Sequence, residues 1–174
     1  MTRIGKVNLH VFSIITRISD VMNMFFPAYA HMLQVSQYCA MLAEKRGENV
    51  ELAEIAGLLH DIAKIKCRDD EAMLSRLVDN WDKHGEVGAE FAEELLLSNN
   101  IVSREECGII CRAISRHCNG NKDNADTAID EILKDADVFS HGMGSVHQGL
   151  TNFRGNRWDK VCEELGMKNY RDCV

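Results

Sequence analysis

Residues 56–64 read AGLLHDIAK, so two adjacent ionisable residues, His60 and Asp61, follow an apolar segment. From Val50 to Lys64 the apolar residues lie nearly all round a helix, the pattern of a helix buried at the centre of a bundle. Burying an imidazole and a carboxylate without partners would cost several kcal/mol. A divalent metal ion removes that cost, because both groups are preferred donors for such ions. The segment therefore indicates either part of a metal centre inside a helical bundle or a core histidine held by ordinary hydrogen bonds.

Helical patterns continue on both sides of this segment. Apolar residues at helical spacing predict a helix from about Tyr29 to Arg46, with Gly47 as its C-terminal cap and His31 in its first turn. On the C-terminal side the helical period resumes after Trp81, which places His84 at a helix start. We therefore predict an all-α protein.

Two later helices bring further donor groups. Ser103 and Glu106 have the spacing of a capping box, and the helix that they begin carries His117 on its apolar stripe. Another helix delivers Asp135 and Asp137 near its end, and periodicity alone does not choose between these two aspartates. The sequence thus supplies histidines and carboxylates from several helices to one candidate site.

Length and composition agree with a single helical domain. The chain has 174 residues and one proline, Pro27, and it is rich in helix-forming residues. No repeat or Gly/Pro/Ser-rich linker divides it. We expect one domain over residues 1–174. Near its end, Trp158, Val161 and Leu165 predict one last short amphipathic helix.

Charge and cysteine content limit the classes of binding partner and the cellular compartment that we expect. The net charge of −7 argues against a nucleic-acid partner, because such proteins usually display a basic face. No stretch approaches the roughly 20 apolar residues of a membrane span, and the first residues show no evident cleavage site, so we expect no membrane association. The seven cysteines form no CxxC pair. Reduced thiols in a cytoplasmic protein are therefore expected.

The positions of His31, the His60-Asp61 pair and Asp137 resemble those of the HD-domain superfamily of metal-dependent phosphohydrolases, which is named for the adjacent His-Asp pair. The resemblance covers roughly residues 29–140, with residues 141–174 as a helical tail. It implies an HD-type helical bundle in which these four residues ligate a divalent metal. Asp137 matches through the stretch KDADVF (residues 134–139), and Asp135 would then lie behind the ligands or on the surface.

Two further histidines look like those that bind a second metal in binuclear branches of the superfamily. They are His84, in HGEVGA (residues 84–89), and His117, in AISRH (residues 113–117). The resemblance thus implies one or two ions of Fe, Mn, Co, Ni, Zn or Mg. The histidine set is most similar to HD-type hydrolases that split diadenosine tetraphosphate symmetrically, although Met143 stands where that group usually has an arginine, and Cys118 replaces the threonine of their His-Thr-x-Gly stretch.

The activity that this resemblance implies is hydrolysis of a nucleotide, or of another small phosphate ester or anhydride, by metal-activated water. Asp61 is then the shared ligand of two ions. Lys64 either contacts a phosphate oxygen or is simply a favourable cation at a helix C-terminus. Dinucleotide and nucleoside monophosphate substrates both remain open, as does a homodimer.

Two other classes of protein use similar residues. Some HD-type proteins resembling inositol oxygenase hold two irons and activate oxygen, and others are non-catalytic regulatory modules. The other histidines and the arginines near His117 are expected to have ordinary structural or solvated roles: His10, His141, His147, Arg112 and Arg116. The apolar segment 11–26 either packs on the domain or forms a dimer contact, and the tail arginines 154, 157 and 171 either cap a cleft or face solvent.

Overall fold

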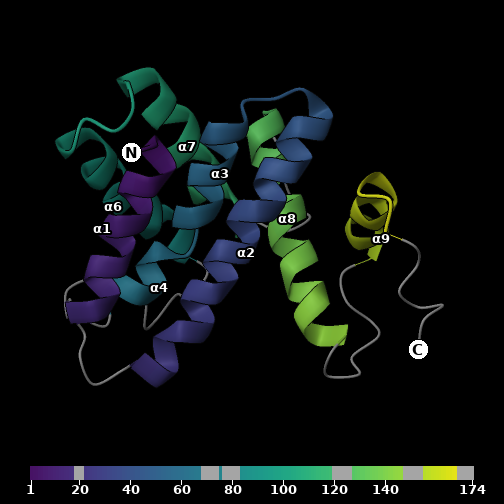
Figure 1. Ribbon diagram of the computed structural model, residues 1–174, viewed down its shortest axis with the longest axis horizontal. Coiled ribbons are helices and arrows are strands. Elements are labelled where there is room, and N and C mark those ends of the chain that lie inside the picture. Colours follow the sequence, from purple (N-terminus) through teal and green to yellow (C-terminus); the bar gives the residue numbers. More distant parts are fainter. Residues whose placement is uncertain (18–21, 68–74, 76–82, 119–126, 147–154, 168–174) are drawn as a thin grey trace.

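The structure, a computed structural model, describes residues 1–17, 22–67, 75, 83–118, 127–146 and 155–167. These ranges contain helices and no strand, which confirms the predicted all-α class. None of the helices in them is long and apolar enough to cross a membrane. The helices, shown in Figure 1, are α1 (Arg3–Arg17), α2 (Met22–Arg46), α3 (Val50–Leu59), α4 (Ile62–Lys66), α6 (His84–Ser98), α7 (Arg104–Arg116), α8 (Ala128–Val146) and α9 (Gly155–Glu164).

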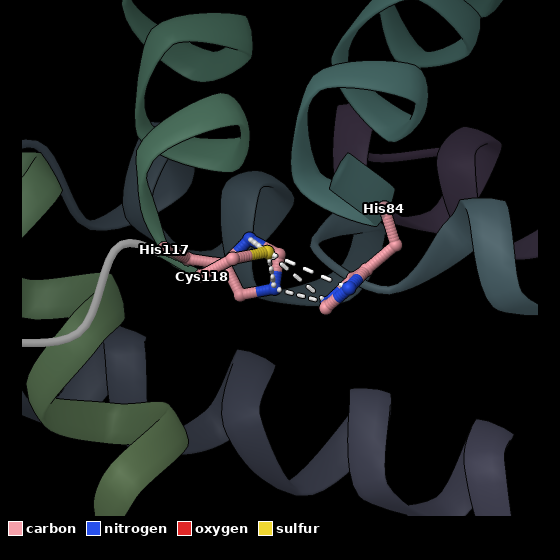
Figure 2. Close-up of side chains that lie close together, drawn as sticks. All are labelled: His84, His117 and Cys118. Atoms are coloured by element: carbon pink, nitrogen blue, oxygen red, sulfur yellow. Dashed lines mark hydrogen bonds between the residues drawn. The ribbon is translucent and has the colours of Figure 1, made fainter. Parts of the chain in front are cut away.

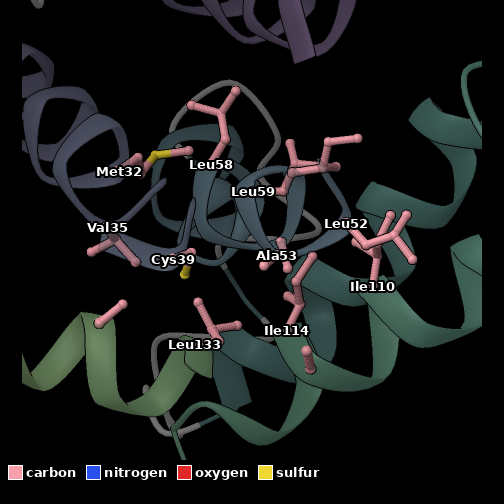
Figure 3. Packing of buried hydrophobic residues seen from close by; sticks show 14 of the residues in the cluster. Met32, Val35, Cys39, Leu52, Ala53, Leu58, Leu59, Ile110, Ile114 and Leu133 are labelled. Atoms are coloured by element: carbon pink, nitrogen blue, oxygen red, sulfur yellow. The ribbon is translucent and has the colours of Figure 1, made fainter. Parts of the chain in front are cut away.

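Helix α3 occupies the centre of the bundle. It packs against α1, α2, α7 and α8, and nearly every residue from Leu52 to Leu59 is buried. Figure 3 shows the apolar side chains of α2, α3, α7 and α8 meeting around it. The helix begins where the side chain of Asn49 accepts a hydrogen bond from the Leu52 amide, at 3.1 Å. The central, nearly all-apolar helix predicted from the sequence is thus present.

A close contact between α2 and α3 depends on Gly57. A Cβ atom at this position would lie 2.8 Å from the Cα atom of Ser36 in α2, which is too close for any real contact. The absence of a side chain lets the two backbones approach one another. This approach also brings α2, which carries His31, close to α3, which His60 directly follows.

The helix predicted to run from Val50 to Lys64 is interrupted at the His-Asp pair, so that prediction was wrong in its extent. Helix α3 ends at Leu59, and α4 begins at Ile62. The backbone of Asp61 has φ −106° and ψ 15°, outside the α-helical region. Because the helix stops there, the side chains of His60 and Asp61 project from a turn.

The first described helix, α1, packs on the bundle. Val7, Val11 and Ile15 are buried in the same apolar core as α3. Arg3 joins α1 to the rest through ion pairs of 2.5 Å with Glu51 and 2.8 Å with Glu106. Of the apolar segment 11–26, residues 11–15 therefore pack on the domain itself.

The C-terminal part differs from the predicted tail, because α8 continues through residue 141 to Val146. Trp158 of α9 stacks on Phe139 with ring centroids 4.8 Å apart, and a Cβ atom at Gly142 would lie 2.1 Å from the Trp158 ring. The glycine thus provides room for the indole ring. The last predicted amphipathic helix is present as α9.

One buried carboxylate, that of Asp135, ties α9 to α2 and α8. Arg46 of α2 contacts it at 2.7 Å, Arg157 of α9 also pairs with it, and Lys160 lies at 3.4 Å. Arg157 also pairs with Glu131, at 2.7 Å. Arg157 therefore serves neither of its predicted roles, since it holds two helices together; residues 154 and 171 lie outside the described part.

The capping box predicted at the start of α7 is present. The Ser103 hydroxyl accepts a hydrogen bond from the Glu106 amide at 3.2 Å, and the Glu106 carboxylate accepts one from the Ser103 amide at 2.8 Å. We expect Ser103→Ala to lower the free energy of unfolding by about 1 kcal/mol, because an amide of the first turn loses its partner. Urea unfolding measures this change. Ser13→Ala inside α1 should change stability less, and an equal effect of both substitutions would contradict the capping role.

Candidate metal centre

The structure brings together all six residues that the sequence predicted as metal ligands. They come from widely separated elements: His31 from α2, His60 and Asp61 from the turn after α3, His84 from the first residue of α6, His117 from the C-cap of α7, and Asp137 from α8. All are buried except His31, which is partly buried. Of the two candidate aspartates, Asp135 and Asp137, it is Asp137 that faces the site.

Four of these residues form a first donor group. The Nε2 atom of His31 lies 3.1 Å from Oδ1 of Asp137 and 3.3 Å from Nε2 of His60. Oδ2 of Asp61 is 3.5 Å from Nε2 of His60 and 3.9 Å from Nε2 of His31. Two imidazoles and two carboxylates therefore converge on one point.

A second donor group lies on the other side of Asp61. Its Oδ1 atom is 3.2 Å from Nε2 of His84 and 3.5 Å from Nε2 of His117. The two Nε2 atoms are 3.1 Å apart. Figure 2 shows both imidazoles pointing toward one another from α6 and from the end of α7. Asp61 thus presents one carboxylate oxygen to each group.

The surroundings of the Asp61 Oδ1 atom show whether these residues fit a metal ion. It is buried and accepts no hydrogen bond, although two imidazoles face it. A buried carboxylate oxygen without a hydrogen bond is costly unless it is paired or coordinates a metal. The donor set of imidazole nitrogens and carboxylate oxygens suits Zn, Mn or Fe. The residues therefore fit a divalent ion on each side of Asp61.

Hydrogen bonds on the far side of three imidazoles orient their Nε2 atoms toward the centre. Nδ1 of His60 donates to the Gly57 carbonyl at 2.8 Å, and Nδ1 of His117 donates to the Ile114 carbonyl at 2.6 Å. Nδ1 of His31 lies 3.0 Å from the Ser140 hydroxyl, which itself donates to Gln34. Such partners fix the tautomer of a metal-binding histidine.

The electrostatics of the two groups differ. Burial lowers the pKa of His60 to about 4, so its imidazole is neutral and its Nε2 lone pair is free. Burial would also lower the pKa of His84 and His117, but contacts with Asp61 and Cys118 raise these values to about 9 and about 10. The second group therefore attracts positive charge even though it is buried.

Lys64, predicted as a catalytic residue, lies at the edge of the site. Its ammonium contacts Oδ2 of Asp61 at 2.8 Å from one turn along the chain, and the side chain is 26% exposed. It therefore supplies positive charge next to the first donor group. Arg112 remains partly exposed, and its guanidinium lies 3.4 Å from the buried carboxylate of Asp130.

Sequence reasoning missed two residues at the site. Sγ of Cys118 lies 3.2 Å from Nε2 of His84, and Nε2 of His141 lies 3.3 Å from Oδ1 of Asp137. The signals were present, because Cys118 directly follows a candidate ligand and His141 is one helical turn after another. Neither residue is among the predicted ligands, and the sequence predicts an ordinary role for His141.

Comparison with known proteins agrees with this geometry. Residues 28–142 match the HD domain family. Ribonuclease Y of Enterococcus faecalis is 30% identical over 71% of this chain and 20% of its own length, and ribonuclease Y of Streptococcus agalactiae is 29% identical over 86% of this chain and 25% of its own. The chain thus spans a quarter or less of these relatives.

A solved structure shares the fold. It is the crystal structure of a predicted HD superfamily hydrolase from an uncultured Thermotogales bacterium, with a TM-score of 0.61 and 22% sequence identity. The match covers 93% of this chain and 83% of the other. The helical arrangement around the site is therefore one that a solved protein also adopts.

Proposed function

The chain belongs to the HD domain family, and on this premise we propose that it is a metal-dependent phosphohydrolase with two metal positions that share Asp61. The ligands proposed for the first position are His31, His60, Asp61 and Asp137. Those proposed for the second are Asp61, His84 and His117. A nucleotide or another small phosphate ester or anhydride is the proposed substrate.

The observation that carries this proposal is the position of Asp61 between the two donor groups. Its Oδ2 atom faces His60 at 3.5 Å, while its Oδ1 atom faces His84 at 3.2 Å. A carboxylate placed in this way can bridge two cations. Two ions held close together are a common arrangement for phosphoryl hydrolysis, because they can stabilise the attacking and the leaving oxygens.

Bound ions would act as Lewis acids and make hydroxide available at neutral pH. The chain's own residues hold the components in place. His60 and His117 are fixed by carbonyl groups behind them, and Ser140 orients His31 in the same way. Lys64 neutralises part of the charge on Asp61 and can contact a phosphate oxygen from the open side, because its side chain is partly exposed.

The acidic chain supports a small substrate over RNA, since a net charge of −7 repels a polyanion. The relatives named ribonuclease Y make an RNA phosphodiester the second candidate. Phosphate release from mononucleotides and dinucleotides, beside cleavage of an oligoribonucleotide, separates these substrates. Turnover of the oligoribonucleotide alone would contradict the small-substrate proposal.

The two other protein classes, the di-iron oxygenase and the regulatory module, would also give distinct results in activity assays. A di-iron oxygenase would require iron and consume oxygen, and a regulatory module would bind metal or nucleotide without turnover. We expect phosphate release with added Mn, Co or Mg and no oxygen consumption. The protein should be purified without a chelator and without a histidine tag before metal is added. Oxygen consumption with no phosphate release would overturn the hydrolase proposal.

Replacing one ligand of the second position should remove one ion. We expect His117→Ala to bind one metal equivalent where the unchanged protein binds two, and to lose about 10²-fold or more in turnover, as when one preorganised charge-stabilising group is removed. Elemental analysis and phosphate release measure the two effects. His10→Ala in α1, outside both donor groups, is the control. Unchanged metal content and turnover in His117→Ala would contradict the two-metal proposal.

A further inference from the structure

The second donor group contains a sulfur atom that the proposed function does not use. Sγ of Cys118 lies 3.2 Å from Nε2 of His84 and 3.4 Å from Nε2 of His117 (Figure 2). These two Nε2 atoms are 3.1 Å apart, and Oδ1 of Asp61 lies 3.2 Å and 3.5 Å from them. These five separations fall between 3.1 and 3.5 Å, so His84 and His117 each lie close to both the thiol and the carboxylate.

These separations are close to the edges of a metal-centred tetrahedron. Donors at about 2.0–2.3 Å from a tetrahedral ion are about 3.3–3.8 Å from one another. The two imidazoles and the thiol would reach those values by moving outward by only a few tenths of an ångström. The two imidazoles and the thiol are therefore already spaced as three ligands of one tetrahedral ion, and Oδ1 of Asp61 lies beside the same two imidazoles.

The backbone provides space for this sulfur atom. Gly85 follows His84 in the first turn of α6, and a Cβ atom there would lie 2.8 Å from Sγ of Cys118 and 2.8 Å from the Ile114 carbonyl oxygen. Any other residue at this position would force Cys118 or the end of α7 to shift. Helix α7 ends at Arg116, so the consecutive side chains of His117 and Cys118 both reach toward α6.

The chemistry of the donors distinguishes the two metal positions. The first group has only nitrogen and oxygen donors, which suit Mn, Fe or Mg. A thiolate is a softer donor and favours zinc over manganese or magnesium. The two sides of Asp61 therefore differ in the ions that they prefer.

From these observations we infer that the Cys118 thiolate is a ligand of the second metal position, which it completes as a tetrahedral site for a thiophilic divalent ion such as Zn²⁺. This inference rests on the proposed function, because it adds a ligand to one of its two metal positions. It predicts a tightly held zinc ion beside a more exchangeable ion in the first position. The thiol proton is released when the ion binds.

Cobalt(II) is a suitable probe, because sulfur ligation gives a charge-transfer band in the near ultraviolet. We expect the cobalt-loaded protein to show this band and the Cys118→Ser variant to lack it. Zinc affinity of the second position should fall by at least about 100-fold, because loss of even an outer partner of a ligand costs 10–100-fold. The matched control is Cys111→Ser, whose sulfur lies near Cys107 on the same helix.

A measurement on the unchanged protein avoids dependence on the variant's folding. X-ray absorption of the zinc-loaded protein should show sulfur scattering at about 2.3 Å. Its absence, or a cobalt band that persists in Cys118→Ser and disappears in Cys111→Ser, would overturn the role of Cys118. Bound metal and phosphate release without sulfur ligation would leave the proposed function standing, whereas failure to bind any metal would overturn both.

Discussion

Asp61→Asn should remove both metal equivalents and lower turnover by more than about 10³-fold, the largest functional effect expected of any single change in this chain. The substitution keeps the shape of the side chain but replaces one oxygen with an NH₂ group and removes the negative charge. The Oδ1 and Oδ2 atoms of Asp61 face His84 and His60 at 3.2 and 3.5 Å, so both donor groups lose their shared carboxylate. Elemental analysis and phosphate release measure the two losses.

The control for this experiment is Asp159→Asn, which changes an exposed carboxylate of α9. It should bind two equivalents and turn over substrate as the unchanged protein does. Circular dichroism and urea unfolding establish that Asp61→Asn remains folded. A folded Asp61→Asn protein with normal metal content and normal activity would defeat the assignment of the site.

The largest effect on stability is expected from Asp135→Ala, which should lower the free energy of unfolding by about 3 kcal/mol or more. This carboxylate is fully buried, and Arg46, Arg157 and Lys160 converge on it. Its removal leaves the guanidinium groups of Arg46 and Arg157 partly buried with fewer partners. A loss of this size is a large fraction of the 5–15 kcal/mol that stabilises a typical domain.

Urea unfolding monitored by circular dichroism measures this loss. Arg46→Ala should destabilise less, because Arg157 and Lys160 would still accompany the Asp135 carboxylate. Asp159→Ala in the exposed part of α9 is the matched control and should have little effect. A change below about 1 kcal/mol in Asp135→Ala would show that the ion cluster contributes little to stability.

Much of the fold followed from local sequence patterns. The C-terminal end of α2 at Arg46, the capping box at Ser103 and the apolar character of α3 are set by neighbouring residues, so periodicity and capping rules detected them. The convergence of six donor residues was expected from a resemblance, and the structure places their side chains together.

Other features depend on tertiary contacts that the sequence does not display locally. The apolar pattern runs through His60 and Asp61 without a proline, and its one glycine, Gly57, lies inside α3, so the pattern gave no sign that the helix stops there. The sequence predicts a separate helical tail from residue 141, yet Gly142 lies inside α8, where the Trp158 ring packs against it. In the same way, only the packing of α6 on α7 brings Cys118 to His84.

The order of the donor residues along the chain has a consequence for synthesis on the ribosome. His31 and Asp137 are 106 residues apart in sequence and 3.1 Å apart in the fold. A nascent chain that has emerged as far as Cys118 carries every proposed ligand except Asp137. The second donor group can therefore form before α8 exists, whereas the first is completed only when α8 docks beside α2. On this view the growing chain acquires its proposed metal positions in sequence, and hydrolysis begins only after the later one is complete.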